Sequence, residues 1–150
     1  MIEELELLYR ERLADFTRAA TAIAGNEESG RDAVQDAFAK ALRKRRRFRG
    51  DGNLEAWVWR IVVNAARDAG RRRRRQAAAP TPVDMRAGEL ELPLELLTER
   101  QREVLFLNYY ADLDYATIAH ALDISPGTVG ATLSAARQTL RGALTKEVSR

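Results

Sequence analysis

The side chains best suited to bind a ligand lie in one segment, residues 53–75, which reads NLEAWVWRIVVNAARDAGRRRRR. It combines two tryptophans, asparagine and a run of five arginines. Arginines neutralise phosphates, and aromatic rings stack on unpaired bases, a contact that contributes about 1–3 kcal/mol per base. The segment therefore indicates a surface for a nucleic acid, and in particular for a single strand whose bases are unstacked.

The basic charge of the chain is concentrated around this segment. Residues 40–75 hold 14 Lys and Arg against 3 Asp and Glu, whereas residues 1–39 and 76–150 have net charges of −5 and −3. The whole chain has a net charge of only +3. This distribution is typical of a localised site for a polyanion, and not of a protein that is basic throughout.

A helix over about 54–73 would place the polar side chains of this segment on one face. On a wheel with 100° per residue, a polar stripe forms from Arg60, Asn64, Arg67, Arg71 and Arg74. The predicted buried face consists of Leu54, Val58, Ile61 and Ala65. Trp57 lies on the seam between the two faces, and Trp59 lies on the opposite flank.

A solvated basic face with two structural tryptophans is the alternative explanation of this pattern. Five consecutive arginines repel one another, however, and the segment has too few acidic residues to relieve the repulsion, whereas a polyanion would. A nuclear-localisation signal would explain the arginines, but neither the tryptophans nor the helices that follow.

The rest of the chain also shows helical periodicity, and no segment alternates like a strand. We predict helices over 3–24, 31–46, 54–73, 98–110, 114–122 and 125–144, with Ser29, Thr98 and Ser125 as N-caps. Residues 48–53 read as a loop, and residues 76–95, with three of the four prolines, read as a linker. The predicted fold is all-α, with two small helical domains, 1–75 and 96–150, joined by the short linker 76–95. The second domain has a helix-turn-helix pattern.

The composition argues against several other kinds of protein. The chain has no cysteine, and its one histidine, His120, cannot form a zinc site or an acid-base pair that the sequence supports, so we expect no metal, no cofactor and no enzyme. No apolar run approaches the about 20 residues of a membrane span. The N-terminus is acidic and amphipathic, unlike a signal peptide, so the expected location is the cytoplasm without membrane insertion.

Three segments, in this order, resemble the extracytoplasmic-function (ECF) sigma factors of bacterial RNA polymerase. Residues 29–42, SGRDAVQDAFAKAL, are similar to the family segment that docks on the polymerase clamp helices. Residues 48–75, which begin FRGDGNLEAW, resemble the segment that melts and reads the minus-ten element. Residues 97–141, which begin LTERQREVLF, resemble the domain that reads the minus-thirty-five element. The resemblance covers about residues 9–75 and 96–144.

The resemblance implies a transcription initiation factor that binds core RNA polymerase and directs it to promoter DNA. The implied polymerase-binding residues are Asp32, Gln35 and Asp36. The implied minus-ten residues are Arg49, Asp51, Asn53, Trp57, Arg60, Asn64, Arg67 and Arg71. The implied minus-thirty-five residues are Ser125, Thr128, Thr132, Arg137, Gln138 and Arg141. For Trp57 and Trp59, core packing and base contact both stay open. An anti-sigma factor is a further partner that the family allows.

The predicted recognition helix departs from the family pattern. Family members usually carry basic residues here, as in GTVKSRLSRAR, whereas this chain reads GTVGATLSAAR and has Gly130, Thr132 and Ala135 at the expected basic positions. On a helical wheel, the residues predicted to face the core are Val129, Leu133, Ala136 and Leu140. The predicted outward face consists of Gly127, Thr128, Ala131, Ser134, Ala135 and Gln138, with Arg137 and Arg141 on its flank. This outward face has no Lys or Arg that could bind guanine in a bidentate way. In the preceding turn, Asp123 replaces the usual glycine, and Asp tolerates left-handed geometry at some cost.

This departure leaves two functions open. The first is a promoter-specificity factor that depends mainly on the minus-ten element. The second is a sigma-like regulatory or interaction protein, which binds polymerase or an anti-sigma factor without productive promoter recognition. Transcription by core polymerase from genomic fragments distinguishes the two.

Overall fold

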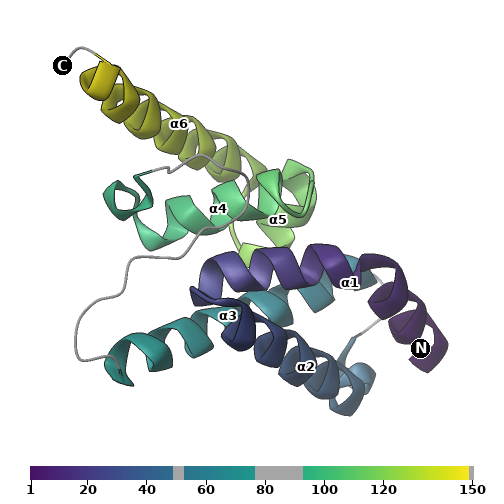
Figure 1. Ribbon diagram of the computed structural model, residues 1–150. Helices are drawn as coiled ribbons and strands as arrows, with labels where there is room; N and C mark the ends of the chain where they lie inside the picture. Colours follow the sequence, from purple (N-terminus) through teal and green to yellow (C-terminus); the bar gives the residue numbers. More distant parts are fainter. Residues whose placement is uncertain (49–52, 77–92, 149–150) are drawn as a thin grey trace.

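The computed structural model describes residues 1–48, 53–76 and 93–148, whose regular structure is entirely helical (Figure 1). The first group of helices comprises α1 (Ile2–Ala24), α2 (Glu27–Arg43) and α3 (Leu54–Gln76), with the 3-10 turn η1 (Arg45–Arg47). The second group comprises α4 (Glu99–Tyr109), α5 (Tyr115–Leu122) and α6 (Pro126–Val148), preceded by the 3-10 turn η2 (Leu94–Leu96). The predicted all-α class is confirmed.

Local sequence explains where most of these helices begin. Thr98 and Gln101 form a capping box at the start of α4, in which each side chain accepts from the backbone N–H of the other residue. At the start of α6, Ser125 Oγ accepts from the backbone N–H of Thr128 at 3.1 Å. The predicted caps Thr98 and Ser125 are therefore confirmed. Asp123 has φ 58° at the end of α5, which is the left-handed geometry expected for this position.

The predicted boundaries of α2 were wrong at both ends. Its N-cap is Asn26, whose side chain accepts from the backbone N–H of Ser29 at 2.8 Å, so Ser29 lies inside the first turn. Asn26 has extended backbone geometry, and the acidic Glu27 and Glu28 follow it, where they interact favourably with the helix dipole. The helix ends at Arg43, and the basic residues after Lys44 form η1.

Close packing in the first group depends on small residues where α1 meets α2. A Cβ atom added to Gly30 would lie 2.6 Å from the backbone nitrogen of Thr21, so only glycine fits there without a shift of α1. Gly25 ends α1 with φ 102°, and its N–H donates to the carbonyl of Thr21 at 2.8 Å. The chain can therefore reverse within two residues and bring α2 back along α1.

The buried face of α3 differs from the predicted one. Val58 is fully buried, as predicted. The other fully buried residues of α3 lie outside the predicted face: Ala56, Trp59, Val62, Val63, Ala66 and Gly70. Leu54, Ile61 and Ala65 are only partly buried and pack on the edge of the core. The difference arises because α3 contacts α1 and α2 on one side and α5 on another, so more than one of its faces is covered.

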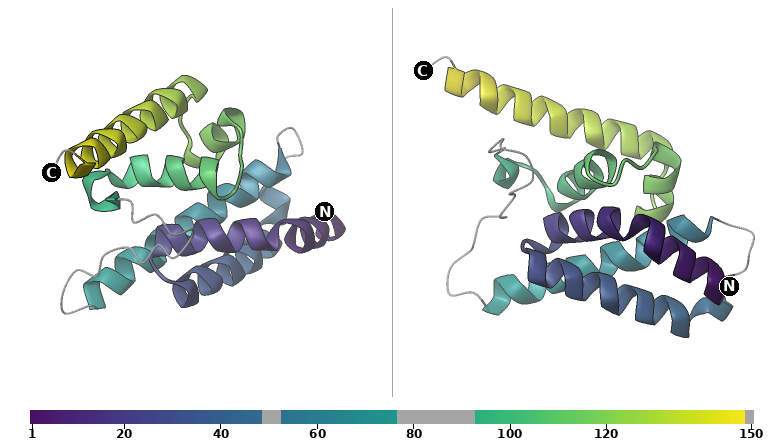
Figure 2. Two further views of the ribbon diagram at one scale, coloured as in Figure 1. Left: turned by 45° about the horizontal axis from the view of Figure 1, so that its top comes forward. Right: turned by 45° about the vertical axis from the view of Figure 1, so that its right-hand side comes forward.

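The two groups of helices pack directly on each other. One cluster of buried side chains runs from Phe16 and Trp59 in the first group to Leu107 and Ile118 in the second. The contacts between the groups are mainly those of α3 with α5 and of α1 with α4. Figure 2 shows α4, α5 and α6 stacked on one side of α1 and α3. A second, smaller cluster joins Ala22 of α1 to Phe106 and Leu140. The two groups therefore share their hydrophobic core.

Candidate nucleic-acid interface

The predicted polar stripe of α3 is covered in part by the second group of helices. Arg60 donates from Nε and Nη2 to the carbonyl oxygen of His120, at 3.1 and 2.7 Å. One turn further, Asn64 is exposed. Arg67 then binds Glu103 in a bidentate way, with Nε–Oε2 and Nη2–Oε1 distances of 2.8 and 2.9 Å. These side chains do lie along one face of α3, but the arginines among them already have partners.

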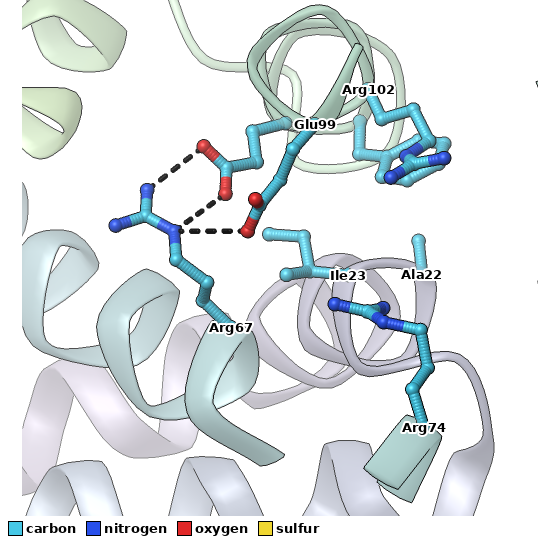
Figure 3. A pocket seen from close by; sticks show the side chains of 8 residues that line it. Ala22, Ile23, Arg67, Arg74, Glu99 and Arg102 are labelled. Carbon is cyan, nitrogen blue, oxygen red and sulfur yellow. Dashed lines mark hydrogen bonds and ion pairs between the residues drawn. The ribbon is translucent and has the colours of Figure 1, made fainter. Parts of the chain in front are cut away.

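The pair formed by Arg67 and Glu103 is the most buried polar contact of this surface. Glu103 is 2% exposed, and no other polar or charged residue is buried in the part of the chain that the structure describes. The hydrogen bonds between Arg67 and Glu103 raise the pKa of Arg67 above its ordinary value, although burial of the guanidinium lowers it. Figure 3 shows Arg67 reaching across from α3 to Glu99 on α4, with Arg74 and Arg102 beside the same small pocket.

The run of five arginines has two kinds of role. Arg71 donates to Glu99 at 3.3 and 3.4 Å. Arg73 turns back to the first group, where its Nε donates to the carbonyl oxygen of Ala24 at 3.1 Å and so satisfies the C-terminal end of α1. The remaining arginines are exposed at the end of α3, where an open hollow is lined by Asp68, Arg71, Arg72, Arg74 and Arg75.

The structure separates the two tryptophans. Trp59 is fully buried, its ring lies 4.4 Å from that of Phe16, and its Nε1 donates to Glu55 at 3.4 Å. It is therefore a core residue and cannot contact a base in this conformation. Trp57 is partly buried, and its ring lies 5.5 Å from that of Phe48, the first residue of the predicted loop.

The predicted loop over residues 48–53 lies mostly outside the described residues, and so do Arg49 and Asp51. Its last residue, Asn53, is described and has a structural role that the sequence analysis missed. Asn53 Oδ1 accepts from the backbone N–H of Glu55 at 2.9 Å and so caps the first turn of α3. An asparagine just before an apolar helix is itself a capping signal and could have predicted this contact.

The predicted polymerase-binding residues form an open surface. Asp32, Gln35 and Asp36 are all exposed, while the opposite face of α2 is buried against α1 and α3 through Ala33, Val34 and Ala37. The structure thus brings the three residues together on one face of one helix.

The last helix has the burial pattern that the sequence predicted. Its inward residues are buried: Val129, Leu133, Ala136 and Leu140. Most of the predicted outward positions are exposed, among them Thr128, Ser134 and Gln138, whereas Ala135 is partly buried. Arg137 and Arg141, predicted on the flank, are also exposed, and Thr132 is partly buried. Ser125 is exposed but already acts as the N-cap, and its hydroxyl lies 2.8 Å from that of Thr128.

Other kinds of site find little support in the described residues. Those residues contain no group of three or more His, Cys, Asp or Glu side chains that could hold a metal ion. Within the same residues, no helix combines the length and the apolar character that a membrane span requires.

Comparison with known proteins identifies the family. The model of sigma-70 region 2 matches residues 8–76, and that of sigma-70 region 4 matches residues 88–140. The ECF RNA polymerase sigma factor SigM of Mycobacterium tuberculosis is 30% identical over 143 residues, which cover 89% of this chain and 73% of SigM. The chain belongs to the ECF sigma factor family. The predicted family is thereby confirmed.

Two solved structures share the fold of this chain. The sigma factor RpoE from Bartonella quintana, in complex with the anti-sigma factor NepR, matches with a TM-score of 0.71 and 25% identity over 95% of this chain and 98% of that one. CnrH, in complex with the cytosolic domain of CnrY, matches with a TM-score of 0.73 and 24% identity, over 97% and 90% of the two chains. The likeness to CnrH concerns the fold alone.

Membership of this family establishes the general function. The protein is a transcription initiation factor that binds core RNA polymerase and directs it to promoter DNA. Helices α2 and α3 fall within the region 2 match, which begins inside α1 at residue 8, and helices α4 to α6 begin within the region 4 match.

Proposed function

We propose that this sigma factor selects promoters mainly through the minus-ten element. The observation that carries the proposal is the contrast between α3 and α6. On α3, exposed Asn64 is flanked on one face by Arg60, Arg67 and Arg71. On α6, the exposed residues before Arg137 are small or neutral, and such side chains supply neither phosphate neutralisation nor bidentate base contacts.

The proposed division of the chain follows from this contrast. Residues 1–75 would dock on polymerase and bind the minus-ten element, residues 76–95 would act as the linker, and residues 96–150 would form the minus-thirty-five-type domain. Asp32, Gln35 and Asp36 are proposed to contact polymerase, because they form an open acidic and polar face on α2.

The proposed mechanism on the minus-ten element requires no catalysis by the sigma factor. Arg60, Arg67 and Arg71 would neutralise phosphates of the separated strand, while Asn64 would read a base edge. Trp57, together with the loop that holds Arg49 and Asp51, would receive an unstacked base; stacking on an aromatic ring contributes about 1–3 kcal/mol. This binding energy stabilises the open strand and so favours melting. Polymerase carries out synthesis, and the complex would act in the cytoplasm.

The second domain is proposed to make weaker contacts. Arg137 and Arg141 would reach phosphates, while Ser125, Thr128, Thr132 and Gln138 would lie closest to the groove. The small side chains would allow the helix backbone to approach DNA closely, which gives a contribution from DNA shape.

An anti-sigma factor is proposed as a regulatory partner. RpoE, which shares this fold, is bound to the anti-sigma factor NepR in its solved structure, and CnrH is bound to the cytosolic domain of CnrY. The alternative of a sigma-like regulatory protein without productive promoter recognition rests on the neutral surface of α6. It predicts polymerase binding without transcription.

Run-off transcription with core polymerase tests the proposal. Scrambling the minus-ten element should reduce activity far more than scrambling the minus-thirty-five element. In parallel, Asn64→Ala should change base preference at one position, because it removes a base contact, whereas Arg71→Ala should weaken all promoters alike, because phosphates are common to every sequence. A larger effect of the minus-thirty-five scramble would refute the proposal, and polymerase binding with no transcript would favour the alternative.

A further inference from the structure

A second group of basic side chains, the η1 cluster, lies before α3 at the end of α2. It holds six cations within eight residues: Lys40, Arg43, Lys44, Arg45, Arg46 and Arg47. Figure 1 shows the end of α2 and the end of α3 at opposite ends of the first group of helices. The η1 cluster is therefore separate from the arginine run over residues 71–75, and its side chains have no role in the promoter contacts described above.

Local structure accounts for half of the η1 cluster. Lys40 and Arg43 lie in the last turn of α2, where positive charge interacts favourably with the helix dipole. Arg45 Nη1 donates to the carbonyl oxygen of Leu42 at 2.6 Å and so satisfies one of the last carbonyl groups of α2. These three residues support the end of the helix.

Arg46 and Arg47 have no such role. Both are exposed, and neither forms an ion pair or a side-chain hydrogen bond with the residues that the structure describes. The charge of the cluster is also uncompensated: the nearby charge of Lys40 is the main cause that lowers the pKa of Lys44, followed by desolvation and by two arginines of the cluster. Repulsion of this kind is relieved by a polyanion.

The two exposed arginines lead directly to the proposed stacking ring. Phe48 follows Arg47 in the chain, and the ring of Phe48 lies 5.5 Å from the ring of Trp57. Surfaces that bind single strands combine aromatic rings, on which bases stack, with cations that follow the sugar-phosphate backbone. A strand with one base against Trp57 would carry its neighbouring phosphates towards Arg46 and Arg47.

We propose that Arg46 and Arg47 bind phosphates of the promoter strand next to the base that stacks on Trp57. The proposal rests on the proposed role of Trp57 in minus-ten binding. Phosphate contacts carry no sequence information, so these two arginines add affinity for the opened strand at every promoter alike.

The salt dependence of strand binding tests the proposal. The probe is a fluorescein-labelled single-stranded oligonucleotide with the minus-ten sequence of a promoter that the holoenzyme opens. Fluorescence anisotropy measures its affinity for the assembled holoenzyme over a range of salt concentrations. The test variant is Arg46→Gln combined with Arg47→Gln, and because both side chains are exposed, circular dichroism should show the wild-type fold.

Two further variants serve as controls. Arg10→Gln combined with Arg18→Gln removes two exposed cations of α1 and so reproduces the change in net charge at another place. Arg46→Lys combined with Arg47→Lys keeps both positive charges at the proposed site. Lysine binds phosphate as a point charge, so this variant should retain the contacts.

The expected result is a smaller salt dependence in the test variant alone. Each contact with a phosphate of a single strand contributes about 0.7 to the slope of log affinity against log salt concentration. Loss of two contacts should therefore reduce the magnitude of the slope by about 1.4. The α1 control and the lysine variant should both keep the wild-type slope.

A second measurement locates the contact on the strand. The emission of 2-aminopurine, placed at each position in turn, identifies the base whose signal depends on Trp57 by comparison with Trp57→Ala. Neutral methylphosphonate groups then replace the phosphates one at a time. Replacement beside the identified base should weaken binding by the wild type, but should have no further effect on the test variant, because both changes remove the same contact.

Three outcomes would overturn the proposal. They are a wild-type salt slope in the test variant, equal sensitivity of the test variant and the wild type to every methylphosphonate, and loss of polymerase binding by the test variant in a pull-down. The last outcome would assign the η1 cluster to polymerase and not to DNA.

The design also distinguishes this proposal from the proposed function. If minus-ten recognition is wrong, the holoenzyme will be insensitive to the minus-ten scramble, whatever the salt slopes show. If only the role of Arg46 and Arg47 is wrong, the scramble will reduce transcription while the test variant keeps the wild-type slope.

Discussion

The two tryptophans of α3 should respond in opposite ways to substitution. A buried aromatic side chain removes about 200 Å² of surface from water, which at about 25 cal/mol per Å² corresponds to an upper estimate of about 5 kcal/mol. Trp59 is completely buried and contacts Phe16, so Trp59→Ala should reduce the free energy of unfolding by about 3–5 kcal/mol. Trp57 is only partly buried, and Trp57→Ala should cost about 1 kcal/mol.

For promoter opening, in contrast to stability, substitution of Trp57 should matter more than substitution of Trp59. Trp57→Ala should impair opening of the minus-ten element, because the proposed stacking surface is lost while the fold persists. Trp59→Phe keeps an aromatic ring in the core and loses the indole hydrogen bond to Glu55, so it should lower stability by about 1–2 kcal/mol and leave opening intact in the folded protein.

Urea unfolding followed by circular dichroism measures the stability of each variant. The chain has only these two tryptophans, so Trp57→Phe and Trp59→Phe each leave one fluorescent reporter. In the Trp57→Phe variant, the emission of Trp59 should be insensitive to acrylamide. In the Trp59→Phe variant, the emission of Trp57 should change when promoter DNA is added to the holoenzyme. Equal stability losses in the two alanine variants, or acrylamide quenching of Trp59, would refute this reasoning.

Three further predictions concern other parts of the molecule. Reversing the charges of Asp32 and Asp36 should abolish binding to core polymerase in a pull-down, while stability changes by less than about 1 kcal/mol. Gly30→Ala should lower stability by about 1–3 kcal/mol in urea unfolding, because the new Cβ would collide with the backbone of Thr21. Hydrogen bonds from Thr117 lower the pKa of Asp114, so this cap should stabilise α5 above the ordinary pKa of about 4 and lose that effect as the pH falls through the lowered value, as hydrogen exchange would measure.

Each of these predictions has a matched control. Glu27→Lys changes an exposed acidic residue of α2 that lies on a different face of the helix from Asp32 and Asp36, and it should leave polymerase binding intact. Gly142→Ala adds the same methyl group to a helix where it has no neighbour, so it should not destabilise the protein. Asp114→Asn keeps a good capping residue without a titrating group and should remove the pH dependence of α5. Equal behaviour of variant and control would contradict the corresponding prediction.

The sequence was sufficient to predict those features that depend on interactions between residues close together in the chain. The capping box at Thr98 joins residues three positions apart, and a search of the sequence finds it directly. The inward face of α6 was also predicted correctly, with Val129 and Leu133 buried, because this helix packs through one stripe of apolar residues. The family motifs are likewise contiguous segments, so the sequence was enough to predict the fold class and the general function.

Competing local signals limited the prediction of α2. Asn26 and Ser29 are both good capping residues and lie three positions apart. Propensity alone does not choose between them. The tight turn at Gly25 determines that Asn26 is the N-cap of α2, because it places Asn26 in the extended backbone geometry that an N-cap requires.

The composition and periodicity of the sequence determined that α3 is a helix and that its arginines share a face. Tertiary structure alone decided what those arginines touch. Arg73 reaches Ala24, 49 positions earlier, and Arg67 reaches Glu103, 36 positions later. A helical wheel gives the angles between side chains but not the direction from which a partner helix approaches, and α3 has partners on more than one side. For this reason the burial of Trp59, and the closure of region 4 over the arginine stripe, became visible only in the folded chain.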